Sequence, residues 1–224
     1  MTALASNSHD RAVAPSAVQA PLLACGLECL RGDRLLFSQF DLELLPGEVA
    51  QIEGPNGSGK TSLLRILSGL ALADEGDVLW RGEVIQYALP EYQGEVAYVG
   101  HHNGIKMDLT PLENLAFAQA MAAGKGHLSA MQALAAVKLD GFEDMLCRRL
   151  SAGQRRRTAL ARLLVTGAVL WVLDEPFTAL DREGIRVIEE LLELHLNNDG
   201  LVAMTTHHEL HLDISRVKHI QLPQ

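Results

Sequence analysis

This chain of 224 residues has few aromatic residues and few cysteines. Aromatic side chains make up 4% of the sequence and apolar residues 48%, so a core has to be built mostly from Leu, Val, Ile and Ala. The three cysteines are Cys25, Cys29 and Cys147. Their odd number and their spacing give no disulfide framework and no zinc pattern. We therefore expect unpaired thiols in a reducing compartment.

The chain also has few basic residues and no long apolar run. The 19 basic residues are outnumbered by 28 acidic ones, and the net charge of −9 argues against a general nucleic-acid binder, which needs a basic face. The best apolar stretch, residues 168–173, is as long as a strand and far shorter than the roughly 20 residues of a membrane-spanning helix. Residues 1–21 lack the apolar segment of a signal peptide, so we expect a flexible N-terminal extension there.

One segment of the chain carries a specific chemical pattern. Residues 54–61 match the phosphate-binding loop G-x-x-x-x-G-K-[ST]. In this pattern the glycines let backbone N–H groups surround phosphate oxygens, Lys60 brings a positive charge to the β- and γ-phosphates, and Thr61 offers a hydroxyl to Mg²⁺. The N-terminus of the helix expected after the loop also favours anions. The predicted nucleotide-binding residues here are Gly54, Pro55, Asn56, Gly57, Ser58, Gly59, Lys60, Thr61 and Ser62.

Alternating patterns along the chain predict an α/β fold. Residues 112–146 are rich in Ala, Leu and Met and predict a small helical insert, interrupted at 124–126. Residues 74–77 read as a turn. Strands are expected at 22–31, 35–45, 49–52, 78–80, 96–99, 169–173 and 201–205, and further helices at 154–165 and 182–196. Such alternation gives a mostly parallel sheet covered on both faces, with ligand bound at the carboxyl ends of its strands.

The apolar strand at residues 169–173 ends in two acidic residues. Asp174 fits the carboxylate that holds Mg²⁺ in phosphate-loop enzymes. Glu175 is placed to orient or deprotonate a water for attack on the γ-phosphate. The alternative is a strand that simply stops at a polar surface turn. Together with the phosphate loop, the two acids favour the functional interpretation.

A second candidate anion site precedes the helix expected at residues 154–165. Here Ser151, Gly153 and Gln154 lie in the segment Leu-Ser-Ala-Gly-Gln. A Ser hydroxyl and a Gly N–H at a helix N-terminus bind anions, although Ser151 alone fits an ordinary N-cap equally well. The arginines that follow fit a basic patch or a solvated helix face, and they are Arg155, Arg156, Arg157 and Arg162.

The order of these motifs resembles that of an ABC-type nucleotide-binding domain. The phosphate loop, Ser151–Gln154 and the acid-terminated strand are followed by Asp181 in Ala-Leu-Asp and by His207 in Thr-His. The resemblance covers residues 22–224 and implies a phosphate-loop ABC ATPase core with N-terminal antiparallel strands and a small helical subdomain at about 104–166. It implies ATP and Mg²⁺ as ligands, with Thr61 and Asp174 on the metal.

The resemblance also implies a pair of ATPase chains. Two head-to-tail copies would sandwich two ATP molecules, with the phosphate loop of one copy facing Ser151, Gly153 and Gln154 of the other. Asp181 would lie at the interface between the copies. Glu175, His207 and Lys60 are the expected catalytic residues, with His207 holding the attacking water beside Glu175.

A finer resemblance is to the ATPase of the haem exporter used in bacterial cytochrome c biogenesis. Residues 51–57, 100–115 and 173–181 carry this similarity. It implies a peripheral protein on the cytoplasmic face of the inner membrane, bound to separate permease subunits of the cytochrome c maturation system. Hydrolysis would power haem export or release of the haem-loaded chaperone, and we expect this chain to bind neither haem nor nucleic acid itself.

Two features depart from the usual ABC pattern. A Gln that senses Mg²⁺ and the water usually follows the strand expected at 96–99, and His102 takes its place here. No aromatic residue stands near Arg31 to stack on adenine, which leaves Arg31 itself as a candidate.

Several alternatives stay open at the level of sequence. His207 and His211 are four residues apart and, with His208, suggest a metal site as a second interpretation. As a whole, the chain could also be the ATPase of a lipid or peptide exporter, a soluble ABC ATPase, or a module that closes on ATP without turnover.

Overall fold

The computed structural model describes residues 21–122, 126 and 128–222, so the predicted extension lies almost entirely outside the described residues. Within the described part of the chain, no helix is long and apolar enough to cross a membrane. The elements in chain order are β1 (Leu22–Arg31), β2 (Arg34–Leu44), β3 (Val49–Glu53), α1 (Lys60–Leu67), β4 (Glu75–Trp80), β5 (Glu83–Val84), α2 (Leu89–Gln93), β6 (Val96–Val99), α3 (Pro111–Met121), α4 (Ala130–Ala136), η1 (Cys147–Arg149), α5 (Ala152–Thr166), β7 (Leu170–Asp174), α6 (Arg182–Asn197), β8 (Leu201–Thr205), η2 (Ile214–Arg216) and β9 (Val217–Gln221).

The larger sheet is parallel, as the alternating pattern predicts. Its strand order is β6-β7-β8-β3-β9, and every pairing in it is parallel. The order places β3 beside β8, with β7 next, so the chain leaves β3 and β7 at the same edge. Strand β9 was not predicted. Its mixed segment Val217–Gln221 is only partly buried at the margin of the sheet and lacks the apolar run of a central strand.

The smaller sheet is antiparallel and has the order β2-β1-β4-β5. The turn predicted at residues 74–77 is wrong, because β4 begins at Glu75 and pairs with β1. Gly76 makes this possible. Its φ is +82°, and a Cβ there would lie 2.4 Å from the carbonyl oxygen of Gly26. Gly76, which suggested a turn in the sequence, instead allows an irregular and close pairing of two strands.

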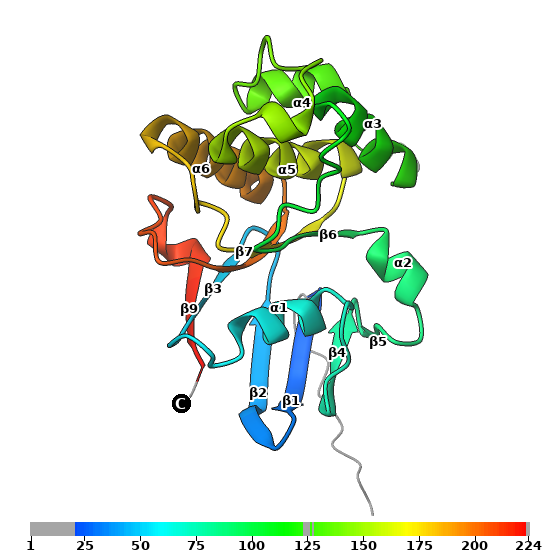
Figure 1. Ribbon diagram of the computed structural model, residues 1–224. Helices are drawn as coiled ribbons and strands as arrows, with labels where there is room; N and C mark the ends of the chain where they lie inside the picture. The colour runs from blue at the N-terminus through cyan, green and yellow to red at the C-terminus, as the bar shows by residue number, and fades with distance from the viewer. Residues whose placement is uncertain (1–20, 123–125, 127, 223–224) are drawn as a thin grey trace, which may run out of the picture.

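Two apolar cores lie on opposite faces of the parallel sheet. On β7, Leu170 and Val172 pack into the core shared with α1 and the antiparallel sheet, whereas Trp171 and Leu173 pack against α5 and α6. This alternation is that of a sheet buried on both faces. Figure 1 shows the resulting layers, with the antiparallel sheet at one end, α1 beside it, and α3 to α6 beyond the parallel sheet.

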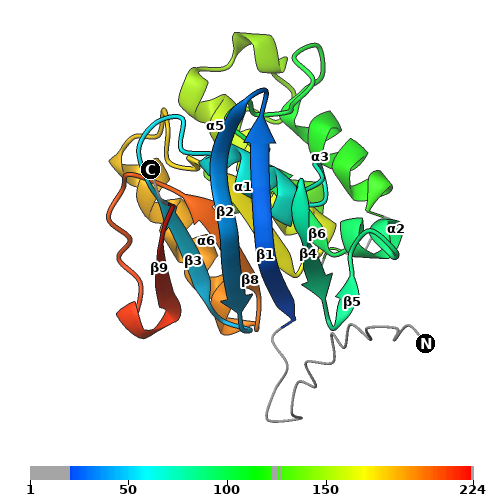
Figure 2. The same cartoon turned by 90° about the horizontal axis from the view of Figure 1, so that it is seen from below.

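Helices α3, α4 and α5 form the region in which a helical subdomain was predicted. Each begins with a capping box, in which the side chains of Thr110, Ser129 and Ser151 accept a hydrogen bond from a backbone N–H. Of the predicted interruption at 124–126, residues 124 and 125 lie outside the described residues. Figure 2 looks onto the antiparallel sheet with α1 behind it.

Candidate active site

The phosphate loop lies between β3 and α1, where the sequence places it. Helix α1 begins after Gly59, which has a φ of +102° and provides no side-chain cap, so the first N–H groups of the helix stay open toward the loop. A Cβ on Gly59 would lie 3.0 Å from a ring carbon of Phe37. Backbone conformation and close packing therefore both require glycine here. The hydroxyl of Ser58 is buried and finds no partner among the described residues.

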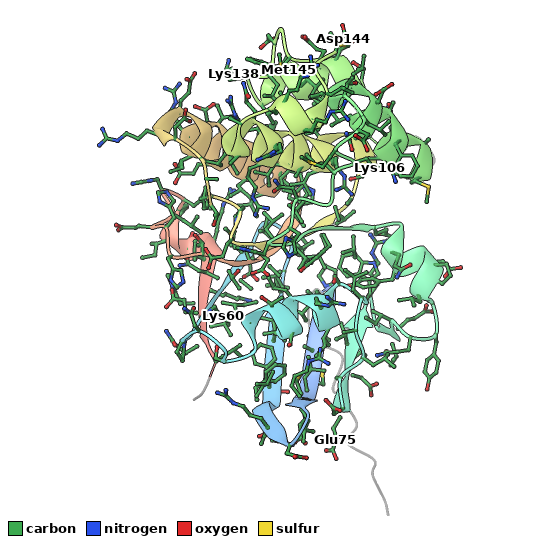
Figure 3. All side chains as sticks on the ribbon, viewed as in Figure 1. Lys60, Glu75, Lys106, Lys138, Asp144 and Met145 are labelled. Carbon is green, nitrogen blue, oxygen red and sulfur yellow. The ribbon has the colours of Figure 1, made fainter. Side chains whose placement is uncertain are left out.

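Lys60 lies folded onto the phosphate loop. Its Nζ donates hydrogen bonds to the carbonyl oxygens of Gly54 at 2.6 Å and Pro55 at 3.1 Å. The ammonium is thus held in the loop by two neutral carbonyl oxygens. A negatively charged phosphate oxygen would be a stronger acceptor for the same group. Figure 3 labels Lys60 near α1, far from Lys138, Asp144 and Met145 at the outer end of the helical region.

Asp174 meets the phosphate loop at the end of β7. Its Oδ2 accepts a hydrogen bond from the hydroxyl of Thr61 at 2.8 Å, and its Oδ1 accepts one from the hydroxyl of Thr205 at 2.7 Å. The residue is 4% exposed. Two hydroxyl groups thus donate to this buried carboxylate. A hydroxyl and a carboxylate oxygen this close together fit Mg²⁺, which prefers oxygen ligands.

Glu175 follows in a strained conformation that turns it out of the strand. Its φ is +49°, which is uncommon for a residue with a side chain, and its N–H donates to the carbonyl and hydroxyl oxygens of Thr205. The Nε2 of His207 lies 3.5 Å from Oε1 of Glu175. The side chain of His207 is 74% exposed, so a ligand can reach both groups. The structure therefore brings together Glu175 and His207, as the sequence predicted.

Two neighbouring cavities surround Lys60. One of about 430 Å³ is lined by the loop together with Asp174, Glu175 and, unexpectedly, Leu36. The other, of about 700 Å³, is lined by Gly54, Pro55 and His207 among others. The first cavity is lined by His101 and not by His102, for which the sequence predicted the contact. The two imidazole rings are 5.6 Å apart, and His102 is exposed.

The second predicted anion site lies outside both of these cavities. Ser151 caps α5 through a hydrogen bond from the N–H of Gln154 at 3.2 Å, and Gln154 Oε1 accepts one from the N–H of Ser151 at 2.9 Å. A Cβ on Gly153 would lie 2.9 Å from the carbonyl oxygen of Ala179. Asp181 likewise caps α6, accepting from the N–H of Gly184 at 2.8 Å. Within one chain these residues do not line the phosphate-loop cavities.

Arg156 is the main site-forming residue that sequence reasoning missed. It is 3% exposed, and all five of its N–H donors are used. They bond to the carbonyl oxygens of Pro176, Gly100, Asp174 and Glu175 and to the side chain of Asn103, at 2.8–3.2 Å. Burial lowers the pKa of Arg156, and the carboxylates of Asp174 and Glu175 oppose that shift. The side chain of Arg156 therefore connects the end of β7 to the segment after β6.

The expectation of a solvated arginine face is therefore wrong for much of the cluster. Arg157 donates to the carbonyls of Val137 and Lys138, and Arg162 donates to those of Asn103 and Gly104. The sequence spacing could have predicted that Arg156 is buried. It lies three, four and seven residues before the buried Ala159, Leu160 and Leu163, on the apolar face of α5.

Thr205 is the other missed contributor. It ends β8 directly opposite Asp174 in the parallel register, and its hydroxyl bonds to both Asp174 and Glu175. The signal for it was its place at the end of a strand adjacent to β7, since the carboxyl ends of parallel strands meet at one edge.

Comparison with known proteins finds a matching family model and close relatives of this chain. The family model described as ABC transporter matches residues 37–178. A relative from Methylococcus capsulatus is 55% identical over 85% of this chain and 93% of its own length, and one from Aliivibrio fischeri is 46% identical over 87% and 95%. Both are named cytochrome c biogenesis ATP-binding export protein CcmA.

The fold has solved counterparts as well. An ATP-binding cassette solved as a dimer, in a post-hydrolysis state with ADP and Pi, superposes with a TM-score of 0.71. It is 22% identical and covers 91% of this chain and 97% of its own, which supports the α/β ABC fold predicted from the sequence. Together the family match and the relatives show that the chain belongs to the ABC transporter family, in the group of cytochrome c biogenesis ATP-binding export proteins.

Proposed function

We propose that this chain is the ATP-hydrolysing subunit of a membrane ABC transporter that serves cytochrome c biogenesis. The observation that carries the chemistry is the 2.8 Å hydrogen bond between Thr61 and Asp174, which joins the phosphate loop to the acid-ended strand β7. The assignment to cytochrome c biogenesis rests on the names of relatives that are 46–55% identical. ATP hydrolysis drives either the export of haem or the release of the haem-loaded chaperone.

Each catalytic role follows from position. The N–H groups at the start of α1 and the Nζ of Lys60 bind the β- and γ-phosphates of ATP. Thr61 and Asp174 would hold Mg²⁺, which would neutralise charge on the phosphate oxygens. Glu175 takes a proton from the attacking water, and His207, 3.5 Å from its carboxylate, positions that water and the γ-phosphate. Thr205 and Arg156 are positioning residues, because they act through Asp174 and Glu175.

The complete site requires a second copy of the chain. Ser151, Gly153 and Gln154 are absent from the lining of both phosphate-loop cavities of their own chain. In a head-to-tail dimer they close the γ-phosphate site of the partner, and the N-terminus of α5 meets the phosphate. Asp181 lies between the two sites in this arrangement. The dimeric state of the similar solved cassette supports this proposal.

The membrane partners are permease subunits of the cytochrome c maturation system, on the cytoplasmic face of the inner membrane. The chain sits there as a peripheral subunit and binds no haem. His102 or its neighbour His101 takes the position of the usual Gln, and the lining of the phosphate-loop cavity favours His101. The adenine contact falls to Leu36 or Arg31, and the same lining favours Leu36.

The experiment that tests the cellular assignment is recovery of partners. The tagged full-length chain is extracted from bacterial membranes in a gentle detergent, and the co-purified proteins are identified by mass spectrometry, with the Lys60→Ala variant alongside. We expect membrane subunits of the cytochrome c maturation system with both chains, because Lys60 lies in the nucleotide site. Recovery of a different permease would reject the link to haem while keeping the ATPase. Recovery of no membrane protein would support a soluble ABC ATPase instead.

A further inference from the structure

A cluster of metal-ligating side chains lies beside the active site but outside the proposed ATPase chemistry. Glu189 projects from α6, and His208 and His211 come from the segment between β8 and η2. One ligand atom from each of these three residues lies within 4.8 Å of the other two. We call this set the Glu189 cluster. Among the described residues, no other such group of three was found.

The three donor atoms lie close together. Oε1 of Glu189 lies 3.2 Å from Nε2 of His208 and 3.0 Å from Nδ1 of His211. Tetrahedral Zn²⁺ with bonds of about 2.0–2.1 Å separates its ligand atoms by about 3.3 Å. Two of the three ligand–ligand distances therefore already match a zinc site, and the third is no longer than 4.8 Å. From these distances we propose that the Glu189 cluster binds a divalent transition-metal ion of the zinc type through Glu189, His208 and His211.

The chemistry of the donor set suits a cation. Neutral imidazole is the form that binds metal, and His₂Glu is a ligand set found in zinc sites that keep an open position. His211 is 73% exposed, which leaves room for water or another ligand to complete the coordination.

The surrounding structure holds the cluster in place without a metal. Leu210 and Leu212, on either side of His211, pack against the apolar core on the α5–α6 face. The ring of His208 lies 4.8 Å from that of Phe177, and its backbone N–H donates to the hydroxyl of Thr206. Binding would therefore order few additional groups, and loss of one histidine should not unfold the chain. Since His208 follows His207 directly, a bound ion would also fix the segment that carries His207.

The test is zinc binding to the full-length chain without a polyhistidine tag, measured by competition with a chromophoric chelator. We expect one zinc bound in the micromolar range or tighter. His211→Ala and Glu189→Gln should each weaken binding by more than about tenfold, because each removes one of three ligands. Cobalt provides a second readout, since a tetrahedral site of this kind gives visible absorption bands that the two variants should lose. Mg²⁺, which prefers oxygen ligands in octahedral geometry, should not compete.

His219→Ala is the matched control. His219 is also exposed and also pairs through Nδ1 with a glutamate, at 2.9 Å from Glu53, but no third ligand in the described part of the chain completes a cluster there. This variant should bind zinc like the unaltered chain. Thermal unfolding of all variants without metal checks that they fold. Absence of micromolar zinc binding would overturn the proposal, and so would binding that both His211→Ala and Glu189→Gln leave intact, as exposed Cys25 could produce.

Discussion

At the scale of single residues, the candidate site depends on side chains that hold backbone rather than touch substrate. Arg156 satisfies carbonyl oxygens on three segments, the end of β7, the turn after it and the residues after β6. Glu175 sits at a φ of +49°, which the surrounding hydrogen bonds must maintain. The orientation of Glu175, the proposed base, therefore depends on the hydrogen bonds around Arg156.

Arg156→Lys should destabilise the protein and lower ATP turnover together. A lysine ammonium has three donors in place of five and lacks the planar fork, so buried carbonyl groups lose partners. We expect a loss of about 3 kcal/mol in the free energy of unfolding, measured by urea denaturation. Arg186→Lys is the control. The Arg186 side chain is 69% exposed and, among the described residues, pairs only with Glu190, so neither stability nor turnover should change by much. Unchanged stability in Arg156→Lys would contradict the role of Arg156.

Sequence alone predicted residues whose chemistry is local and missed those whose role depends on tertiary contacts. The phosphate loop is a contiguous pattern, and Asp174 ends an unmistakably apolar strand, so both could be placed. Arg156 and Thr205 act through partners up to 56 residues away, which no local pattern reveals. Gly76 looked like a turn residue because a glycine with positive φ serves turns and irregular strand pairs alike.

At the scale of elements, α6 contacts the sheet through His195 and also carries Glu189 of the Glu189 cluster. Its face toward the sheet carries His195, whose ring stacks on Trp171 of β7 with centroids 3.8 Å apart. Nε2 of His195 lies 3.1 Å from the carbonyl oxygen of Val169. A Cβ on Gly200 would lie 2.3 Å from this ring, so the turn into β8 needs glycine. The neutral imidazole is thus a packing group in the sheet–helix interface.

This burial predicts a dependence of stability on pH. Burial lowers the pKa of His195 from 6.5 to about 4. Between these values the unfolded chain takes up a proton that the folded chain refuses, so the free energy of unfolding falls as the pH falls. The contribution amounts to at most about 3 kcal/mol between pH 7 and pH 4. His195→Phe keeps a ring against Trp171 and cannot titrate, so its unfolding free energy should fall less over this range.

The measurement is urea denaturation at several pH values between 7 and 4. His102→Ala removes an exposed histidine and should leave the pH dependence of the original chain in place. Equal slopes for His195→Phe and the unaltered chain would show that His195 does not carry the effect. The carbonyl oxygen of Val169 also accepts from the N–H of Leu201, so the phenylalanine leaves no unpaired carbonyl there.

At the scale of the whole molecule, the residues of the proposed ATPase site form two groups that lie apart within one chain. The phosphate loop and the Asp174–Glu175 pair form one group, and the N-terminus of α5 with Ser151 forms the other. Their separation within one chain is what a head-to-tail pair of ATPase subunits would resolve. The family assignment follows from relatives matched over more than nine-tenths of their length, and a sequence pattern restricted to five short motifs already indicated it.

The most direct test of the ATPase centre is the rate of phosphate release by Glu175→Gln, measured beside the unaltered chain and Glu190→Gln. Glutamine keeps the size of the side chain but cannot accept the proton of the attacking water. The account predicts a fall in turnover of about 100-fold or more for Glu175→Gln with ATP binding retained. Glu190, exposed on α6, should tolerate the same change at full activity. Phosphate release by Glu175→Gln at a rate near that of the unaltered chain would contradict the assignment of Glu175 as the catalytic base.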